Sequence, residues 1–157
     1  MTNQINFTFQ DSDWTPPTRF PDLRNEPEVA IDLETKDPDI KVKGPGWPTM
    51  NGNVIGVSVA TNNFKGYYPV AHEAGGNMDI RMVLNWVQDI CRSKATKLFH
   101  NAAYDIGWLR AHGVVVYGKI ADTMIAAALI DENRRAYSLN ALSVDYLSEL
   151  KSEAGLR

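Results

Sequence analysis

The chain has 157 residues, 44% of them hydrophobic, which is enough to bury one core and too short to suggest two, so we expect a single domain. Its formal net charge of −3 argues against binding of nucleic acid through bulk electrostatics, which needs a surplus of Lys and Arg, so any such contact must be local or mediated by metal ions. Cys91 is the single cysteine, which excludes a disulfide framework or a thiolate zinc site within one chain and fits a reducing compartment.

Predicted strands occupy the first half of the domain, after an extended start. Residues 1–26 mix aromatic residues with prolines and show no sustained hydrophobic period, which predicts an extended arm laid over a domain at 27–157. Apolar and polar residues then alternate with the period of two that is typical of strands, at 29–33, 54–60 and 65–70. The Gly/Pro-rich segment 43–48 is predicted to be a loop, in which Trp47 either covers the core or stacks on a base.

The second half follows a helical period, interrupted by short extended segments. An amphipathic helix is predicted over 78–92, beginning near Asn77 or Asp79. The predicted elements that follow are a strand at 97–99, a helix at about 102–112, and a brief extended segment after 114–116. Gly113 is expected to end the helix at 102–112 in a left-handed conformation.

Two further helices are predicted near the end of the chain. Asp122 is the expected N-cap of a helix at 123–130, which is apolar on all sides and should therefore be buried. Ser138 is the expected cap of the last helix. The apolar stripe of that helix comprises Leu139, Leu142, Tyr146 and Leu150. Three strands followed by alternating helices and strands predict an α/β fold, with a mixed five-stranded sheet flanked by helices.

Asp32 and Glu34 lie two residues apart on the first predicted strand, so both side chains leave the same face near its carboxyl end. Two like charges a few ångströms apart are costly to bury unless a divalent cation neutralises them. Hard oxygen ligands of this kind favour Mg²⁺ or Mn²⁺. An isolated Asp-x-Glu pair is also compatible with a strand end that simply faces water.

Asn101 and Asp105 form a second polar cluster at a predicted junction between strand and helix. They are four residues apart at the start of the helix, which places them on one face beside the end of the first strand. A third carboxylate can thus approach Asp32 and Glu34. The alternative is structural, with Asn101 only capping the helix and Asp105 only complementing the helix dipole.

The two acidic clusters together resemble a known family. Ile-Asp-Leu-Glu-Thr at 31–35, followed by His-Asn-Ala-Ala-Tyr-Asp at 100–105, resembles the first two motifs of the DEDD, or DnaQ-like, 3′–5′ exonucleases. Further similarity to the proofreading exonuclease domains of phage-like family A DNA polymerases lies at 43–47, 121–127 and 131–140. The resemblance covers roughly residues 20–157 and implies an RNase H-like fold.

The resemblance also implies an activity and roles for the site residues. The chain is expected to be a metal-dependent 3′–5′ DNA exonuclease that hydrolyses phosphodiesters with two divalent cations, Mg²⁺ or Mn²⁺. Asp32 would bridge both ions, Glu34 would hold one and orient the attacking water, and Asp105 would support the other through water. Asn101 matches a position that contacts the substrate strand near the scissile phosphate. The expected partners are a single-stranded DNA 3′ end and a DNA polymerase domain, fused or separate.

One part of the family pattern is not found. The family carries a fourth acid on a late helix as Tyr-x-x-x-Asp or His-x-x-x-x-Asp, and Asp145 lacks both contexts. We therefore expect a domain truncated at its carboxyl end, lacking the last helix, impaired in catalysis, and open to self-association through apolar surface around Met124 and Leu129. The alternatives are an inactive exonuclease-like remnant that binds protein or nucleic acid, and an RNA-directed exonuclease of the same superfamily.

Other sequence features are interpreted without a role in chemistry. His72 and His112 lack the paired spacing of a zinc site and are interpreted as a loop histidine and a helix-end histidine. The amino-terminal segment has no basic stretch followed by an apolar one, and no apolar run approaches the roughly 20 residues that span a bilayer. A protein without membrane contact, in the cytoplasm of a bacterial host or phage-infected cell, is therefore expected.

Overall fold

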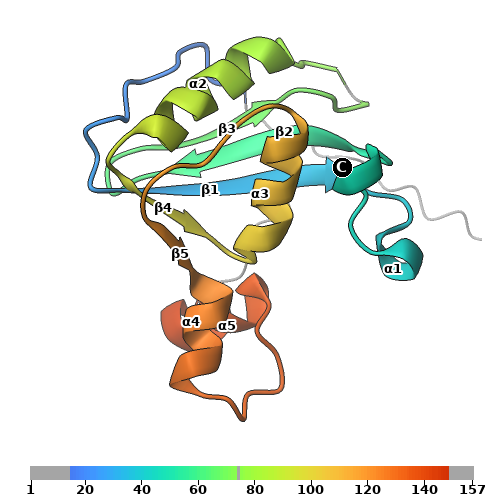
Figure 1. Cartoon of the computed structure of the whole chain (residues 1–157). Coiled ribbons are helices and arrows are strands. Elements are labelled where there is room, and N and C mark those ends of the chain that lie inside the picture. The colour runs from blue at the N-terminus through green and yellow to red at the C-terminus, as the bar shows by residue number, and fades with distance from the viewer. Residues whose placement is uncertain (1–14, 74, 149–157) are drawn as a thin grey trace, which may run out of the picture.

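A mixed five-stranded sheet forms the centre of the computed structural model, which describes residues 15–73 and 75–148. The strands are β1 (Glu28–Lys36), β2 (Asn53–Ala60), β3 (Lys65–Pro69), β4 (Thr96–Phe99) and β5 (Ile120–Asp122). They lie in the order β3-β2-β1-β4-β5 (Figure 1). β1–β2 and β2–β3 pair antiparallel, whereas β1–β4 and β4–β5 pair parallel. The mixed five-stranded sheet expected from the sequence is thus confirmed.

Helices connect or follow the strands, and three of them begin at a capping side chain. They are α1 (Ile40–Lys43), the 3-10 helix η1 (Trp47–Thr49), α2 (Ile80–Arg92), α3 (Ala102–Ala111), α4 (Thr123–Ile130) and α5 (Leu139–Leu147). Asp79 accepts a hydrogen bond from Arg81 N before α2, and Ser138 accepts one from Ala141 N before α5, as predicted. α1 and η1 overlap the segment 43–48, predicted as a loop, because single-turn helices share the local geometry of turns.

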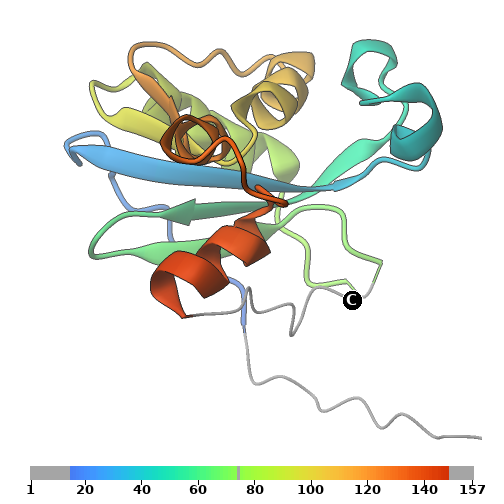
Figure 2. The same cartoon turned by 90° about the horizontal axis from the view of Figure 1, so that it is seen from below.

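α2 and α3 cover one face of the sheet, and the strand residues that point toward them are buried. In β1 these buried residues are Val29, Ile31 and Leu33. Trp86 of α2 packs on Tyr68 of β3, with ring centroids 4.7 Å apart. Figure 2 shows α3 on one side of the sheet and α5 on the other. The alternate residues of β1, which include Asp32 and Glu34, therefore face away from the main core.

Residues 19–23, in the described part of the predicted arm, lie against this core. The carbonyl oxygen of Pro21 accepts a hydrogen bond from Trp86 Nε1 at 2.7 Å, and that of Arg19 accepts one from the Tyr68 hydroxyl at 3.0 Å. Leu23 is buried. The first 14 residues lie outside the described residues, and the division of the chain after residue 26 stays a prediction.

α4 is not buried, although its sequence is apolar on all sides. Ala127 is its single buried residue, whereas Ile125, Leu129 and Ile130 are 56%, 84% and 74% exposed. α4 and α5 lie together beyond the end of β5 (Figure 1). The prediction of a buried helix is therefore wrong, because an apolar composition shows what a helix has to bury but not whether a neighbour covers it.

The apolar stripe predicted for α5 is covered only in part. Leu142 is buried, but Tyr146 is 56% exposed, and Leu150 lies outside the described residues. Across the part of the chain that the structure describes, no helix combines the length and the apolar character that crossing a bilayer requires.

Candidate active site

Two carboxylates leave the open face of β1 near its carboxyl end. Asp32 and Glu34 are half-buried, and in the antiparallel register their neighbours on β2 are Ser58 and Gly56. The register shifts directly afterwards, between Glu34 and Thr35, and such bulges re-aim side chains next to active sites. The alternation of buried and half-buried residues along β1 agrees with the predicted shared face of the two acids.

Asp105 is the third acid, in the first turn of α3, where it is 3% exposed. Its carboxylate accepts a hydrogen bond from Leu33 N at 3.3 Å, which brings it to the backbone of β1 between Asp32 and Glu34. Burial and then the charge of Asp32 raise the pKa of Asp105 to about 7, against the opposing effect of the Leu33 N–H, and Glu34 and Asp122 add to the rise. A buried acid with acidic neighbours favours a bound cation.

The donor set suits a divalent cation, with Asp32 and Glu34 as the residues able to hold it. Both offer the hard oxygen ligands that Mg²⁺ and Mn²⁺ prefer. The pKa of Asp105 is raised by burial and then by the charge of Asp32, and a cation would relieve this repulsion. Within residues 15–73 and 75–148, however, no group of three or more His, Cys, Asp or Glu side chains is placed to hold one ion. Asp105 accepts a hydrogen bond from the β1 backbone through Oδ1.

Hydrogen bonds and packing fasten α3 to the end of β1 beside these acids. The Tyr104 hydroxyl donates to Asp37 Oδ2 at 3.1 Å and therefore accepts from Thr35 Oγ1 at 2.7 Å, because a phenol has one proton. Trp47 packs against Gly107 of α3 and against the hydrophobic core. This position confirms the interpretation of Trp47 as a residue that covers the core.

Asp122 joins the starts of two helices through one carboxylate. It accepts hydrogen bonds from the backbone N–H groups of Asn101 at 3.1 Å and Ala102 at 2.7 Å, at the N-cap and first residue of α3, and of Met124 at 2.9 Å and Ile125 at 3.4 Å, in α4. Burial acts to raise the pKa of Asp122, but these hydrogen bonds outweigh it and lower the pKa. The sequence predicted the cap of α4 and missed the bonds to α3, which depend on the pairing of β4 with β5.

Asn101 stands just before α3 with φ at 70°, in the left-handed region that Asn tolerates better than most residues. The residue is exposed, and its side chain makes no capping hydrogen bond, so the alternative of a simple N-cap is not supported. Asn101 is thus the exposed N-cap residue of α3, whereas Asp105, four residues later, is buried in the first turn.

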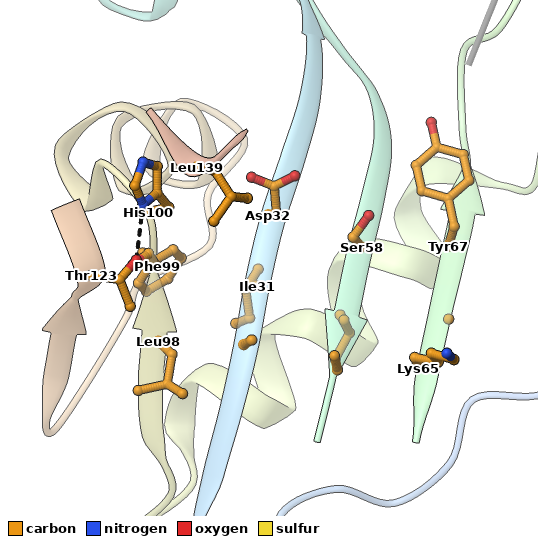
Figure 3. A pocket seen from close by; sticks show the side chains of 14 residues that line it. Ile31, Asp32, Ser58, Lys65, Tyr67, Leu98, Phe99, His100, Thr123 and Leu139 are labelled. Carbon is orange, nitrogen blue, oxygen red and sulfur yellow. Dashed lines mark hydrogen bonds between the residues drawn. The ribbon is translucent and has the colours of Figure 1, made fainter. Parts of the chain in front are cut away.

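A cavity of about 650 Å³ lies on the open face of the sheet beside Asp32 (Figure 3). Ser58 and Tyr67 line it from β2 and β3, and His100 and Thr123 line it from the other side, joined by a hydrogen bond of 2.9 Å. The rest of its wall is largely apolar. Sequence reasoning missed these four residues. Alternation assigns Ser58 and Tyr67 to a strand face but does not give the register that brings them to Asp32. His100 and Thr123 lie outside the strands, directly after β4 and at the start of α4.

Comparison with known proteins identifies the family of the chain. Residues 18–155 match the sequence profile of a 3′–5′ exonuclease domain of family A DNA polymerases. The chain belongs to this exonuclease family. The match spans both acidic clusters and agrees with the resemblance to DEDD exonucleases that their motifs carry.

Relatives of this exonuclease domain are DNA polymerases from phages and bacteria. A DNA-directed DNA polymerase of Pseudomonas phage M6 is 34% identical over 160 residues, which cover 96% of this chain and 24% of the phage protein. DNA polymerase I of Borreliella burgdorferi is 29% identical over 129 residues, which cover 81% of this chain and 12% of that protein. The exonuclease chain thus spans a quarter or less of the length of these relatives.

Solved structures share the fold of the exonuclease domain. NrnC of Brucella melitensis, in a structure with bound Mg²⁺, superposes with a TM-score of 0.61 at 18% identity, covering 88% of this chain and 62% of that chain. RNase D of Escherichia coli, an exoribonuclease involved in structured RNA processing, gives a TM-score of 0.56 at 16% identity, covering 86% of this chain and 32% of that chain. These superpositions establish the RNase H-like exonuclease fold expected from the sequence.

Proposed function

We propose that this exonuclease domain hydrolyses phosphodiester bonds at the 3′ end of a DNA strand, with two divalent cations, Mg²⁺ or Mn²⁺. The observation that carries the proposal is a buried acid, Asp105, beside Asp32 and Glu34 at the carboxyl end of β1. Similarity to DNA polymerases along most of the chain supports DNA as the substrate. The donor chemistry of the acids supports the choice of cation.

Each acid has its own part in the proposed mechanism. Asp32 and Glu34 would hold the cations, and Glu34 would also orient the water that attacks phosphorus. Asp105, which accepts a hydrogen bond from Leu33 N, would support the second cation through water, as the family resemblance implies. Divalent cations held in this way would supply activation of the water and stabilisation of the departing 3′ oxygen. The attack needs no nucleophilic side chain, because water supplies the new oxygen.

The open face of the sheet is proposed to receive the end of the strand. The cavity of about 650 Å³ beside Asp32 lies within the usual size range of sites for small ligands, and its largely apolar wall suits a sugar and base. Asn101, exposed at the start of α3, would hydrogen-bond the strand near the scissile phosphate. The 3′ end must be frayed from its duplex to reach Asp32, which favours mispaired or single-stranded ends.

The proposed setting is replication, with a fused or separate DNA polymerase domain as the partner, in the cytoplasm of a bacterial host or phage-infected cell. Asp32, Glu34 and Asp105 supply three of the four acids of the family pattern, so we expect residues 1–157 alone to be slow. Misplacement of the attacking water can lower the rate on the order of a hundredfold. Where the gene continues beyond Arg157, extension through the next Tyr-x-x-x-Asp or His-x-x-x-x-Asp should accelerate hydrolysis.

Metal binding is the first test. Mn²⁺ should raise the melting temperature of the metal-free protein, because an ion that binds only the folded state stabilises it. Asp32→Asn should remove most of this rise, whereas Glu28→Gln, which changes an exposed acid on the same strand, should retain it. Calorimetry over a series of Mn²⁺ concentrations measures the effect. A flat melting temperature, or an unchanged rise in Asp32→Asn, contradicts the proposed site.

Hydrolysis is the second test. A 5′-labelled single-stranded DNA should be shortened in steps from its 3′ end and give a ladder on a gel. A blocked 3′ end should stop the reaction, and annealing the end into a duplex should slow it. Glu28→Gln should act as wild type and Asp32→Asn should be inactive. Equal cleavage of closed circular single strands would show an endonuclease, and preference for an RNA of the same sequence would overturn the choice of substrate.

A further inference from the structure

Tyr67 reaches from the edge strand of the sheet toward the two acids of β1. It lies on β3 opposite Ser58 of β2, and Ser58 in turn lies opposite Asp32 (Figure 3). Its ring leans along the strands over Gly56, since a Cβ built on Gly56 would lie 1.9 Å from the Tyr67 hydroxyl oxygen. Gly56 is the β2 residue opposite Glu34. The phenol thus occupies the place beside Glu34 that a side chain at position 56 would fill.

His72 and Asn77 hold this phenol from the segment after β3. His72 Nε2 forms a short hydrogen bond with the Tyr67 hydroxyl, and the two rings meet edge to face with centroids 5.7 Å apart. Asn77 clamps the backbone of His72, because His72 N donates to Asn77 Oδ1 at 2.6 Å and Asn77 Nδ2 donates to His72 O at 2.8 Å. His72, interpreted from the sequence as a loop histidine without a chemical role, therefore has a fixed position beside the candidate site.

The protonation state of Tyr67 suits a hydrogen-bond donor. Burial, followed by the charges of Glu34 and Asp32, raises the pKa of Tyr67. The phenol therefore keeps its proton when the carboxylates are ionised, and their charge attracts the positive end of its O–H bond. A phenol has one proton and two lone pairs, so it can accept from an N–H at His72 Nε2 while its own proton turns toward a carboxylate.

We propose that Tyr67, held by His72, is a positioning residue that fixes the orientation of the Glu34 carboxylate. The inference rests on the exonuclease function proposed above and adds a support for the acids on the open face of the sheet. Asp105 contacts β1 from the opposite side, at the Leu33 backbone. Residues that orient metal ligands in this way typically change metal affinity or activity by 10- to 100-fold when they are replaced.

A set of variants separates positioning from simple packing. Tyr67→Phe keeps the ring and removes the hydroxyl, whereas Gly56→Ala keeps the hydroxyl and displaces it by the clash described above. His72→Leu removes the imidazole, and His72→Gln restores a side-chain N–H that can donate to the phenol. Tyr68→Phe is the matched control, because it removes a neighbouring hydroxyl that donates to Arg19 O at 3.0 Å on the other face of the sheet.

The expected result is a loss of turnover with little loss of DNA binding. In Tyr67→Phe, Gly56→Ala and His72→Leu, kcat for 3′-end hydrolysis and the affinity for Mn²⁺ should fall about tenfold or more, with KM for DNA nearly unchanged. His72→Gln should recover part of both. Tyr68→Phe should lower the melting temperature and leave kcat and Mn²⁺ affinity unchanged. Melting temperatures of all variants exclude unfolding as the cause of any loss.

Nitrogen-15 spectra of the histidine rings supply a readout that does not depend on turnover. Binding of Mg²⁺ at Glu34 should shift the ring signals of His72 in the wild-type protein and not in Tyr67→Phe. Unchanged His72 signals in a wild type that binds Mg²⁺, or wild-type kcat in Tyr67→Phe, would overturn the positioning role and leave the exonuclease proposal intact. A wild type that neither binds Mg²⁺ nor hydrolyses DNA would overturn both.

Discussion

Asp105 is held in the folded protein in surroundings that oppose its charge. Its side chain is almost fully buried, and its pKa is raised from 3.8 to about 7, by burial and then by the charge of Asp32. Between these two values the folded state binds more protons than the unfolded state. The free energy of unfolding of the metal-free protein therefore falls as pH rises from about 4 to about 7, by on the order of 4 kcal/mol in total.

Replacing Asp105 should thus stabilise the metal-free protein while abolishing hydrolysis. Asp105→Asn keeps an oxygen that can accept from Leu33 N and removes the charge that burial disfavours. Urea unfolding in EDTA at about pH 5 and about pH 8 should show wild type losing stability between the two values, and the variant losing much less. Glu28→Gln should follow wild type. Parallel pH profiles for wild type and Asp105→Asn would show that the pKa of Asp105 is not raised.

Among the elements, α3 carries Asp105 and is clamped to the segment that follows β1. Trp47 of η1 lies so close to the helix that a Cβ built on Gly107 would be 2.5 Å from Trp47 Nε1. Glycine in the middle of a helix is less favourable than alanine by roughly 1 kcal/mol. The close approach of the indole therefore explains why position 107 has no side chain, and it fixes α3 beside the acids of β1.

A double-mutant cycle tests this contact, because the effect of Gly107→Ala on the free energy of unfolding should change sign when Trp47 is replaced. Gly107→Ala in the wild-type background should lower the free energy of unfolding by about 1 kcal/mol or more, because overpacking outweighs the gain in helix propensity. In a Trp47→Ala background the clash is gone, so the same substitution should stabilise the protein. Urea unfolding of the four proteins measures the cycle. Destabilisation of equal size in both backgrounds would show that the methyl group added at position 107 does not clash with Trp47.

The elements were more predictable from the sequence than the site was. Alternation around Asp32 and Glu34 predicts their shared face, and the caps Asp79, Asp122 and Ser138 predict helix starts, because these signals are local. The approach of Tyr67 to Glu34 depends on how two strands pair with a third, which no local pattern encodes. The exposure of α4 was not predicted for a related reason, because the burial of a helix depends on which elements pack against it.

At the scale of the whole molecule, the two faces of the sheet differ in what covers them. One face of the sheet lies under α2 and α3 (Figure 2) and carries the hydrophobic core, whereas the other face holds the acids and the cavity. α4 adds apolar side chains that face solvent, and Leu129 is the most exposed of them at 84%. Exposed apolar groups in such a cluster do not contribute to the stability of the described fold.

A charge at position 129 should therefore be tolerated. Leu129→Lys should change the free energy of unfolding by less than about 0.5 kcal/mol, because the side chain already faces water. Leu109→Lys, which places the same charge at a fully buried position of α3, should prevent folding or destabilise the protein severely. Circular dichroism and thermal melts of the two variants give the comparison. A large loss in Leu129→Lys would show that α4 is covered.

The carboxylate of Asp122 couples the exposed helix α4 to the start of α3, beside the candidate site. Because it serves Ala102 at the start of α3 and Met124 at the start of α4, neither helix start can open without loosening the other. Their amide protons should accordingly exchange with solvent at one shared rate, as a single cooperative unit. Brief openings of α4 then also release the backbone at Asn101, the residue proposed to contact the DNA strand. Local unfolding at the edge of the molecule should therefore set how often the backbone at Asn101 rearranges.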